Sequence, residues 1–189
     1  MLKKLLAGAA LLFSLHANAT VISVDLDKAS YEVGETISAN LVLSDIQTLV
    51  IAFDAKLDFN QDLVEFRSVS FGDFLSLPGL DKDRVANAQN GQIDLFEMFM
   101  GFAIEDLFDL QAKQPSTSFV LATVTFKAIK HGMSHFGLSG LQVTYDDIAN
   151  GTYTDEETRG VAANTLLVSS PATWLLLLPA LWLMRRRQQ

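Results

Sequence analysis

The stretch FVLATVTFKAI, residues 119–129, indicates a β-strand and sets the pattern for the rest of the chain. Successive side chains of a strand point to opposite faces of its sheet. One face would carry Phe119 and Leu121, and the other would carry Val120, Ala122 and Val124. Because both faces are rich in apolar and β-branched residues, this strand is predicted to lie in the middle of a buried sheet.

Working outward, the same alternation of apolar and polar residues recurs in short segments separated by turn residues such as Gly34, Asn60 and Gly132. Residues 103–111 alone are predicted to form an amphipathic helix. Residues 71–84 are predicted to be an irregular link, and residues 150–160 the most polar loop. Short strands at this spacing predict an all-β fold, an antiparallel two-sheet sandwich of about eight or nine strands. The further predicted strands are residues 36–43, 50–59, 63–69, 93–99, 135–145 and 161–168.

Composition narrows the possible functions. All 22 acidic residues lie between Thr20 and Pro171, and this part of the 189-residue chain has only nine basic residues, which gives it a net charge of −13. Such a surface repels phosphate backbones, so nucleic-acid binding is not expected. The chain has no cysteine, which excludes disulfides, thiolate catalysis and cysteine-bound metals.

The N-terminus has the three parts of a secretory signal peptide. Lys3 and Lys4 precede an apolar run over residues 5–15, and Ala17 and Ala19 form a small-residue cleavage site. Residues 1–19 are therefore predicted to be a signal peptide that signal peptidase removes before Thr20.

The C-terminus, residues 169–189, predicts a membrane segment. An apolar run over residues 174–184 follows Pro171 and ends at an arginine cluster that would stay in the cytoplasm. The cluster comprises Arg185, Arg186 and Arg187, and the preceding motif comprises Ser169, Ser170, Pro171, Ala172 and Thr173. At about 1.5 Å per residue the helix is marginal for a hydrocarbon core of about 30 Å.

This tail resembles the PEP-CTERM sorting signals of bacteria, although the motif departs from Pro-Glu-Pro. The resemblance implies that an exosortase-type membrane protease removes the tail and passes the protein to the cell surface. The alternative is a plain tail anchor. Both readings predict export across the inner membrane, with the domain transiently or permanently anchored by the C-terminal transmembrane helix and finally at the cell surface or outside the cell.

Three segments in order resemble a cohesin-type domain: YEVGETI at residues 31–37, IAFDAKLDFNQDLVEFRSVS at 51–70, and the strand at 119–129 with Gly132 after it. The resemblance covers roughly residues 21–168, within a predicted domain of residues 20–168, and implies a nine-stranded jelly roll related to carbohydrate-binding modules. Characterised cohesins bind dockerin modules through one sheet face, so a dockerin-like protein is one implied partner. The chain has no dockerin-like calcium repeat of its own.

Residues that could carry chemistry are few. His131 and His135 lack a third ligand by spacing, and no G-x-S-x-G serine motif occurs. Oxygen ligands in a turn suit calcium, so the acids flanking Asn150-Gly151 are the candidate ligands if a cation binds: Asp146, Asp147, Asp155, Glu156 and Glu157. No other cofactor or metal is predicted.

Taken together, these patterns predict a noncatalytic exported binding or assembly module. The alternative is a carbohydrate-binding module for exopolysaccharide or another polysaccharide, which would need two or three coplanar exposed aromatic side chains on one sheet face. A hydrolase would need a cleft with a carboxyl group of strongly raised pKa.

Overall fold

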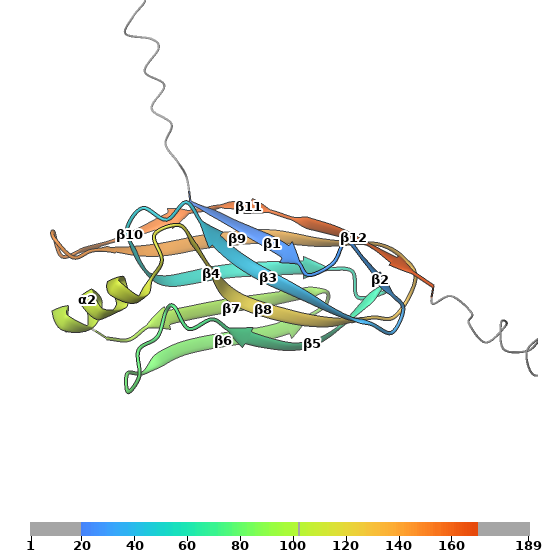
Figure 1. Ribbon diagram of the computed structural model, residues 1–189, viewed down its shortest axis with the longest axis horizontal. Coiled ribbons are helices and arrows are strands. Elements are labelled where there is room, and N and C mark those ends of the chain that lie inside the picture. The colour runs from blue at the N-terminus through green and yellow to red at the C-terminus, as the bar shows by residue number, and fades with distance from the viewer. Residues whose placement is uncertain (1–19, 102, 170–189) are drawn as a thin grey trace, which may run out of the picture.

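The computed structural model describes residues 20–101 and 103–169, and these residues form two β-sheets and a helix. The five-stranded sheet has the order β11-β1-β3-β8-β5. The seven-stranded sheet has the order β2-β12-β9-β4-β7-β6, with β10 paired to β9. Figure 1 shows the two sheets stacked along a common long axis. Their strands are β1 Val21–Leu26, β2 Ser30–Glu32, β3 Thr36–Ser44, β4 Leu49–Phe59, β5 Val64–Phe71, β6 Lys82–Gln89, β7 Gln92–Phe99, β8 Ser118–Ala128, β9 Gly132–Asp147, β10 Thr152–Glu157, β11 Arg159–Val161 and β12 Ala163–Val168.

The predicted all-β two-sheet sandwich is confirmed, and so is the internal position of the strand at residues 119–129. This strand is β8, which pairs with β3 on one side and β5 on the other. Its inward side chains meet those of the other sheet in a continuous apolar core. Phe126 lies at the centre of that core, with the rings of Phe59 and Phe136 at 5.0 and 5.1 Å between centroids.

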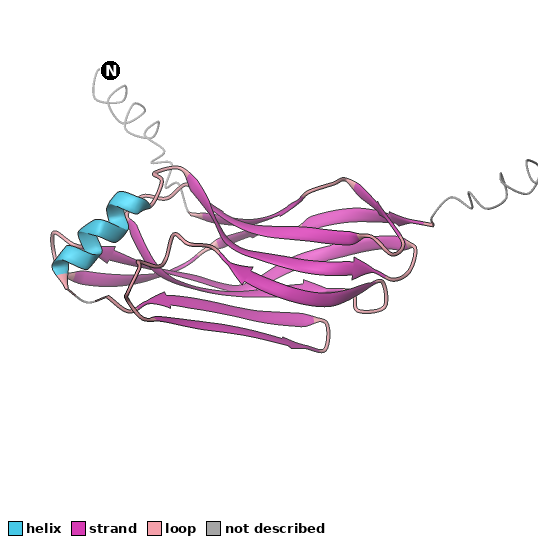
Figure 2. Cartoon of the chain, turned by 60° about the horizontal axis from the view of Figure 1, so that its bottom comes forward, coloured by secondary structure: helices cyan, strands magenta, loops and turns pink. Residues whose placement is uncertain are grey.

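The helix α2, Ile104–Lys113, was predicted at residues 103–111 and lies across one end of the sandwich (Figure 2). Leu107 and Leu110 are buried against Leu49 and Phe99, which closes that end with a second, smaller apolar cluster. After the helix, the Gln114 side chain accepts a hydrogen bond from the Val50 amide at 3.0 Å and donates to the Val50 carbonyl at 2.6 Å. These bonds tie the helix end to β4.

Four details of the sequence prediction were wrong. The described residues contain twelve strands and not the eight or nine expected, and the single strand expected at residues 161–168 breaks at Ala162 into β11 and β12. These two short strands lie in different sheets. Residues 150–160 are not a loop, since they contain β10, and the link expected at 71–84 already includes the start of β6. Every side chain of β10 and all but one of β6 are exposed, so these strands carry no apolar alternation by which to recognise them.

Candidate binding surface

The outer face of the seven-stranded sheet carries one exposed and two half-buried apolar side chains in a border of acids. On β7, Ile93 and Leu95 point into the core, so Phe96 and Met98 point outward. Val85 on β6 lies directly opposite Phe96 in the register and is 46% exposed. We name the outward side chains of β4, β7 and β6 the recognition face: Ala52, Asp54, Lys56, Asp83, Val85, Asn87, Asp94, Phe96 and Met98.

This face and the neighbouring strands are strongly acidic. Lys56 is its one basic side chain, and its ammonium group lies 3.9 Å from the Asp94 carboxylate. Asp54 and Asp83 form no ion pair within the described residues. Beyond the recognition face, Asp155 on β10 accepts a hydrogen bond from Thr144 at 2.7 Å. The arrangement suits a partner that brings apolar side chains together with lysine or arginine.

The outer face of the five-stranded sheet has a different chemistry. Its central rows consist of small polar side chains that hydrogen-bond to one another. The Thr123 hydroxyl donates to Asn40 at 2.7 Å, and the Ser68 and Thr125 hydroxyls share a bond of 2.7 Å. Because these groups already bond to each other, this face offers less to a partner than the recognition face.

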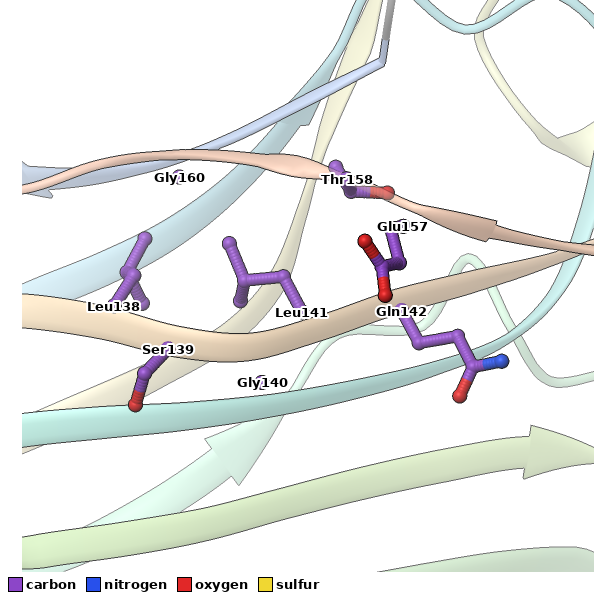
Figure 3. Close-up of a pocket in the computed structure, with 8 residues that line it drawn as sticks. All are labelled: Leu138, Ser139, Gly140, Leu141, Gln142, Glu157, Thr158 and Gly160. Carbon is purple, nitrogen blue, oxygen red and sulfur yellow. The ribbon is translucent and has the colours of Figure 1, made fainter.

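A shallow notch of about 500 Å³ interrupts one edge of β9 (Figure 3). It exists because β12 pairs with the beginning of β9 and β10 with its end, while the chain between them crosses to the other sheet. In Figure 3 the Leu138 and Leu141 side chains point toward Gly160 on β11. A Cβ on Gly160 would lie 2.7 Å from the Leu141 Cδ1 and 3.1 Å from the Leu138 Cβ, so a larger residue at this crossing would displace the Leu141 side chain.

Two carboxyl groups have a raised pKa, but neither lines the notch. Burial raises the pKa of Glu97, and hydrogen bonding and charge from Arg84 oppose that rise. The Arg84 Nε donates to Glu97 at 2.7 Å, so this carboxylate belongs to an ion pair. Burial, and then the charge of Asp147, raise the pKa of Asp146. Both side chains are buried, so neither presents its carboxyl group to a substrate at the surface.

The candidate calcium ligands are spread along the β9–β10 hairpin. Asp146 and Asp147 are successive residues of β9 and therefore point to opposite faces. Asp147 accepts from the Asn150 side chain at 2.6 Å, which holds the turn. Glu156 and Glu157 lie opposite Val143 and Gln142. Within residues 20–101 and 103–169 no three acidic or histidine side chains are grouped to hold a metal ion.

The two histidines among the described residues, and the three tyrosines, are also placed separately. His131 lies in the loop before β9, and the His135 Nδ1 pairs with the Asn164 side chain at 2.8 Å. Tyr31 and Tyr145 are buried, while Tyr153 is exposed. In the described part of the chain, the exposed aromatic side chains are Phe108 on α2 and Tyr153 on β10, which do not form a row on one sheet face.

Most of the predicted processing residues lie outside the described residues. These are Ala17, Ala19, Ser170, Pro171, Ala172, Thr173 and the arginines 185–187. Thr20, expected to become the first residue after cleavage, is buried, and its side chain accepts a hydrogen bond from the Tyr145 hydroxyl. Among the helices formed by described residues, none has the length and apolarity to span a bilayer.

Sequence reasoning did not identify the recognition face. Its strand β6 was not predicted, and Phe96 and Met98 were not distinguished from core residues. One signal was available, because β7 carries apolar residues at both alternating sets of positions although it does not lie deep within its sheet. An outward phenylalanine is informative only as part of a contiguous apolar patch, and the pairing that builds this patch is not visible in the sequence.

Known cohesins share this fold. The structure is similar to a type I cohesin, the seventh of ScaB, from Pseudobacteroides cellulosolvens, with a TM-score of 0.63 and 15% identity over 81% of this chain and 94% of that one. For a type II cohesin from the cellulosome of Acetivibrio cellulolyticus the TM-score is 0.60, with 16% identity over 78% of this chain and 95% of that one. A type I cohesin–dockerin complex from Clostridium thermocellum gives a TM-score of 0.58, with 13% identity over 80% of this chain and 100% of that one.

No curated protein sequence gives a significant match. The sequence model of the cohesin domain, in contrast, matches residues 22–165, which is most of the chain. Cohesin domains are noncatalytic binding modules, in agreement with the prediction that the chain is not an enzyme. With its two-sheet sandwich and this match, the chain belongs to the cohesin domain family.

Proposed function

We propose that this cohesin is an exported module that binds a dockerin-like protein through its recognition face. The observation that supports this assignment is the apolar trio of Val85, Phe96 and Met98, set among the acids of β4, β6 and β7. Interfaces between proteins are built from a desolvated apolar centre with a polar rim. A partner with apolar side chains flanked by lysine or arginine would complement this face.

The family supports the choice of partner class. The related cohesin from Clostridium thermocellum was solved as a complex with a dockerin. By analogy, the present chain would hold the dockerin-like module of another exported protein. The alternative of a glycan ligand lacks the row of aromatic side chains that sugar stacking needs, since the exposed Phe108 and Tyr153 lie on a helix and an edge strand.

The two ends of the sequence support the place where this binding occurs. We infer that signal peptidase cleaves before Thr20 and that the tail from Ser169 onward anchors the domain to the membrane until an exosortase-type protease removes it. The domain would then act at the cell surface or outside the cell. Mass spectrometry of the native protein tests this inference, because termini near Thr20 and Pro171 are expected, and an intact Met1 would contradict export.

Binding is tested with purified dockerin modules immobilised on a biosensor. Replacing Phe96 by serine removes the central apolar side chain and is expected to weaken binding about 30-fold, the effect of losing about 2 kcal/mol at an interface hot spot. Val85→Ser is expected to act in the same direction. The matched control is Val42→Ser, which makes the same replacement on the outer face of the five-stranded sheet.

Two results would contradict the proposal. One is that Val85→Ser and Val42→Ser weaken dockerin binding equally, which would show that binding does not depend on the recognition face. The other is turnover of a polysaccharide by the purified domain, which would overturn the assignment as a noncatalytic module.

A further inference from the structure

A small apolar patch lies where the chain leaves the domain. Met133 on β9 is 71% exposed and lies directly opposite Leu166 on β12, which is 48% exposed. Val168 is 37% exposed and points to the same side of β12 as Leu166. The alternate residues Thr165 and Leu167 are buried and point into the domain. We name Met133, Leu166 and Val168 the apolar foot.

The two strands that carry the foot, β9 as far as Tyr145 and β12, contain no acidic residue. No acidic residue occurs from Lys127 to Tyr145, and none follows Glu157. The loop that leads into β9 contains Lys130 and His131 next to Ile129, which is 43% exposed. Glu32 on β2 lies opposite Val168 in the register. In a region with a net charge of −13, this corner sets apolar and basic side chains beside Glu32 and the Lys28–Glu35 ion pair.

The sequence that follows restricts what can cover the foot. Five residues, 169–173, separate Val168 from the apolar run that begins at Trp174. A fully extended chain spans at most about 3.5 Å per residue, so the foot lies within about 20 Å of that run. This step rests on the proposed function, in which residues 174–184 are inserted in the membrane. The foot can then reach the lipid headgroup layer.

We propose that the apolar foot lies against the membrane surface and orients the anchored domain. A stable contact between two copies of the chain needs about 800 Å² on each partner, more than three partly exposed side chains offer. A lipid interface has no such requirement, because apolar side chains next to basic ones insert among headgroups individually. The contact is an orienting one, and the tail supplies the attachment.

This contact fixes which end of the domain faces outward. In Figure 1, α2 lies at one end of the long axis and β12 leaves the domain at the other. With the foot on the membrane, α2 points away from it. Ile104 and Phe108, both 53% exposed on α2, would then be far from lipid.

The full chain is suited to a direct test because it contains no cysteine, so one introduced cysteine carries the only label. Met133→Cys or Leu166→Cys is labelled with bimane, and the chain is reconstituted in vesicles of phosphatidylethanolamine and phosphatidylglycerol with a spin-labelled headgroup lipid. Quenching at these positions is expected to exceed that at the matched control, Phe108→Cys, at least about threefold, since quenching needs near contact. Adding Leu166→Glu to the Met133→Cys chain is expected to remove most of this difference.

Flotation of the vesicles is measured on the same samples. If the vesicles carry the protein but quenching is equal at both ends, the membrane contact of the apolar foot is overturned and the anchoring proposal stands. Failure to float would overturn both, while dockerin binding is scored separately on the biosensor. Excimer emission from pyrene at Met133→Cys without lipid quenching would assign the patch to a second copy and overturn the lipid contact.

Discussion

Replacing Arg84 by methionine is expected to destabilise the domain, because Arg84 joins the free edges of the two sheets. Its guanidinium group lies 2.6 Å from Glu97 on β7, donates to the Gly72 carbonyl after β5 at 2.7 Å, and stacks over the Phe71 ring at 5.2 Å. Glu97 is only 1% exposed. Arg84→Met keeps the apolar stem but leaves a buried carboxylate without its counter-charge.

The expected loss at pH 7.5 is about 3–5 kcal/mol of unfolding free energy, the cost of removing one partner from a buried ion pair. Burial already raises the pKa of Glu97 above its ordinary value of 4.5, and removing Arg84 raises it further. A group with a raised pKa favours folding below its unfolded pKa, and that contribution is lost as pH rises through the folded pKa. The variant should therefore regain part of its stability between pH 7.5 and pH 5.

Urea unfolding of residues 20–169, followed by far-ultraviolet circular dichroism, measures this change, since both tryptophans lie beyond residue 169. The control is the double variant Arg84→Met with Glu97→Leu, which buries no unpaired charge and should recover most of the loss. Equal stability of Arg84→Met and the natural sequence at pH 7.5 would refute the reasoning. A loss that does not shrink at pH 5 would refute the role given to the Glu97 charge.

Three further changes test other parts of the fold by the same unfolding measurement. Tyr31→Phe should cost about 1–2 kcal/mol, because the Tyr31 hydroxyl donates to Asp27 at 2.7 Å. Burial opposes ionisation of Asp27, but hydrogen bonds from Tyr31 and the Ser38 amide outweigh it and lower its pKa below 3.8. The stability difference between Tyr31→Phe and the natural sequence should therefore shrink as pH falls through that lowered pKa. Gly72→Ala should cost about 1–3 kcal/mol, since its Cβ would lie 2.1 Å from the Val120 carbonyl oxygen. The matched control Gly137→Ala, whose Cβ would lie 3.3 Å from the His135 side chain and 3.6 Å from the Asp58 Cβ, should stay within about 0.5 kcal/mol. Phe126→Ala should cost about 3–5 kcal/mol by leaving a cavity among Phe59, Phe66 and Phe136, and a loss below 1 kcal/mol would contradict its central place in the core.

The buried strands could be predicted from the sequence because burial leaves a period of two. Inward residues of β3, such as Ile37 and Leu41, alternate with polar ones, and β4 repeats the pattern with Phe53, Ala55 and Leu57. Bulges interrupt this alternation. On β8 a bulge brings Phe119, Leu121 and Val124 all into the core, although the pattern predicted Val124 on the opposite face. Where β4 meets β9, a bulge near Ile51 takes Ile51 out of the main core and packs it in the cluster beneath α2. Strands without a buried face could not be predicted in this way, and β10 is the example.

The candidate site could not be predicted because its residues come together only through pairing between strands. Val85 and Phe96 are eleven positions apart in the sequence and become direct neighbours through the β6–β7 register, while Asp54 reaches Phe96 through the register of β4 with β7. The calcium candidates, in contrast, are close in sequence and were expected to gather at a turn. The hairpin instead spaces them along two strands.

The sequence by itself determined that this chain forms a two-sheet sandwich, because alternating hydrophobicity specifies which side of each strand is buried. The cohesin type followed from the resemblance of three sequence segments to that family. Tertiary structure alone decided which outer face carries the apolar trio of Val85, Phe96 and Met98 and where β11 and β12 separate between the sheets. The reason is that alternation distinguishes core from surface along one strand, whereas a binding surface depends on which strands become neighbours and in which register.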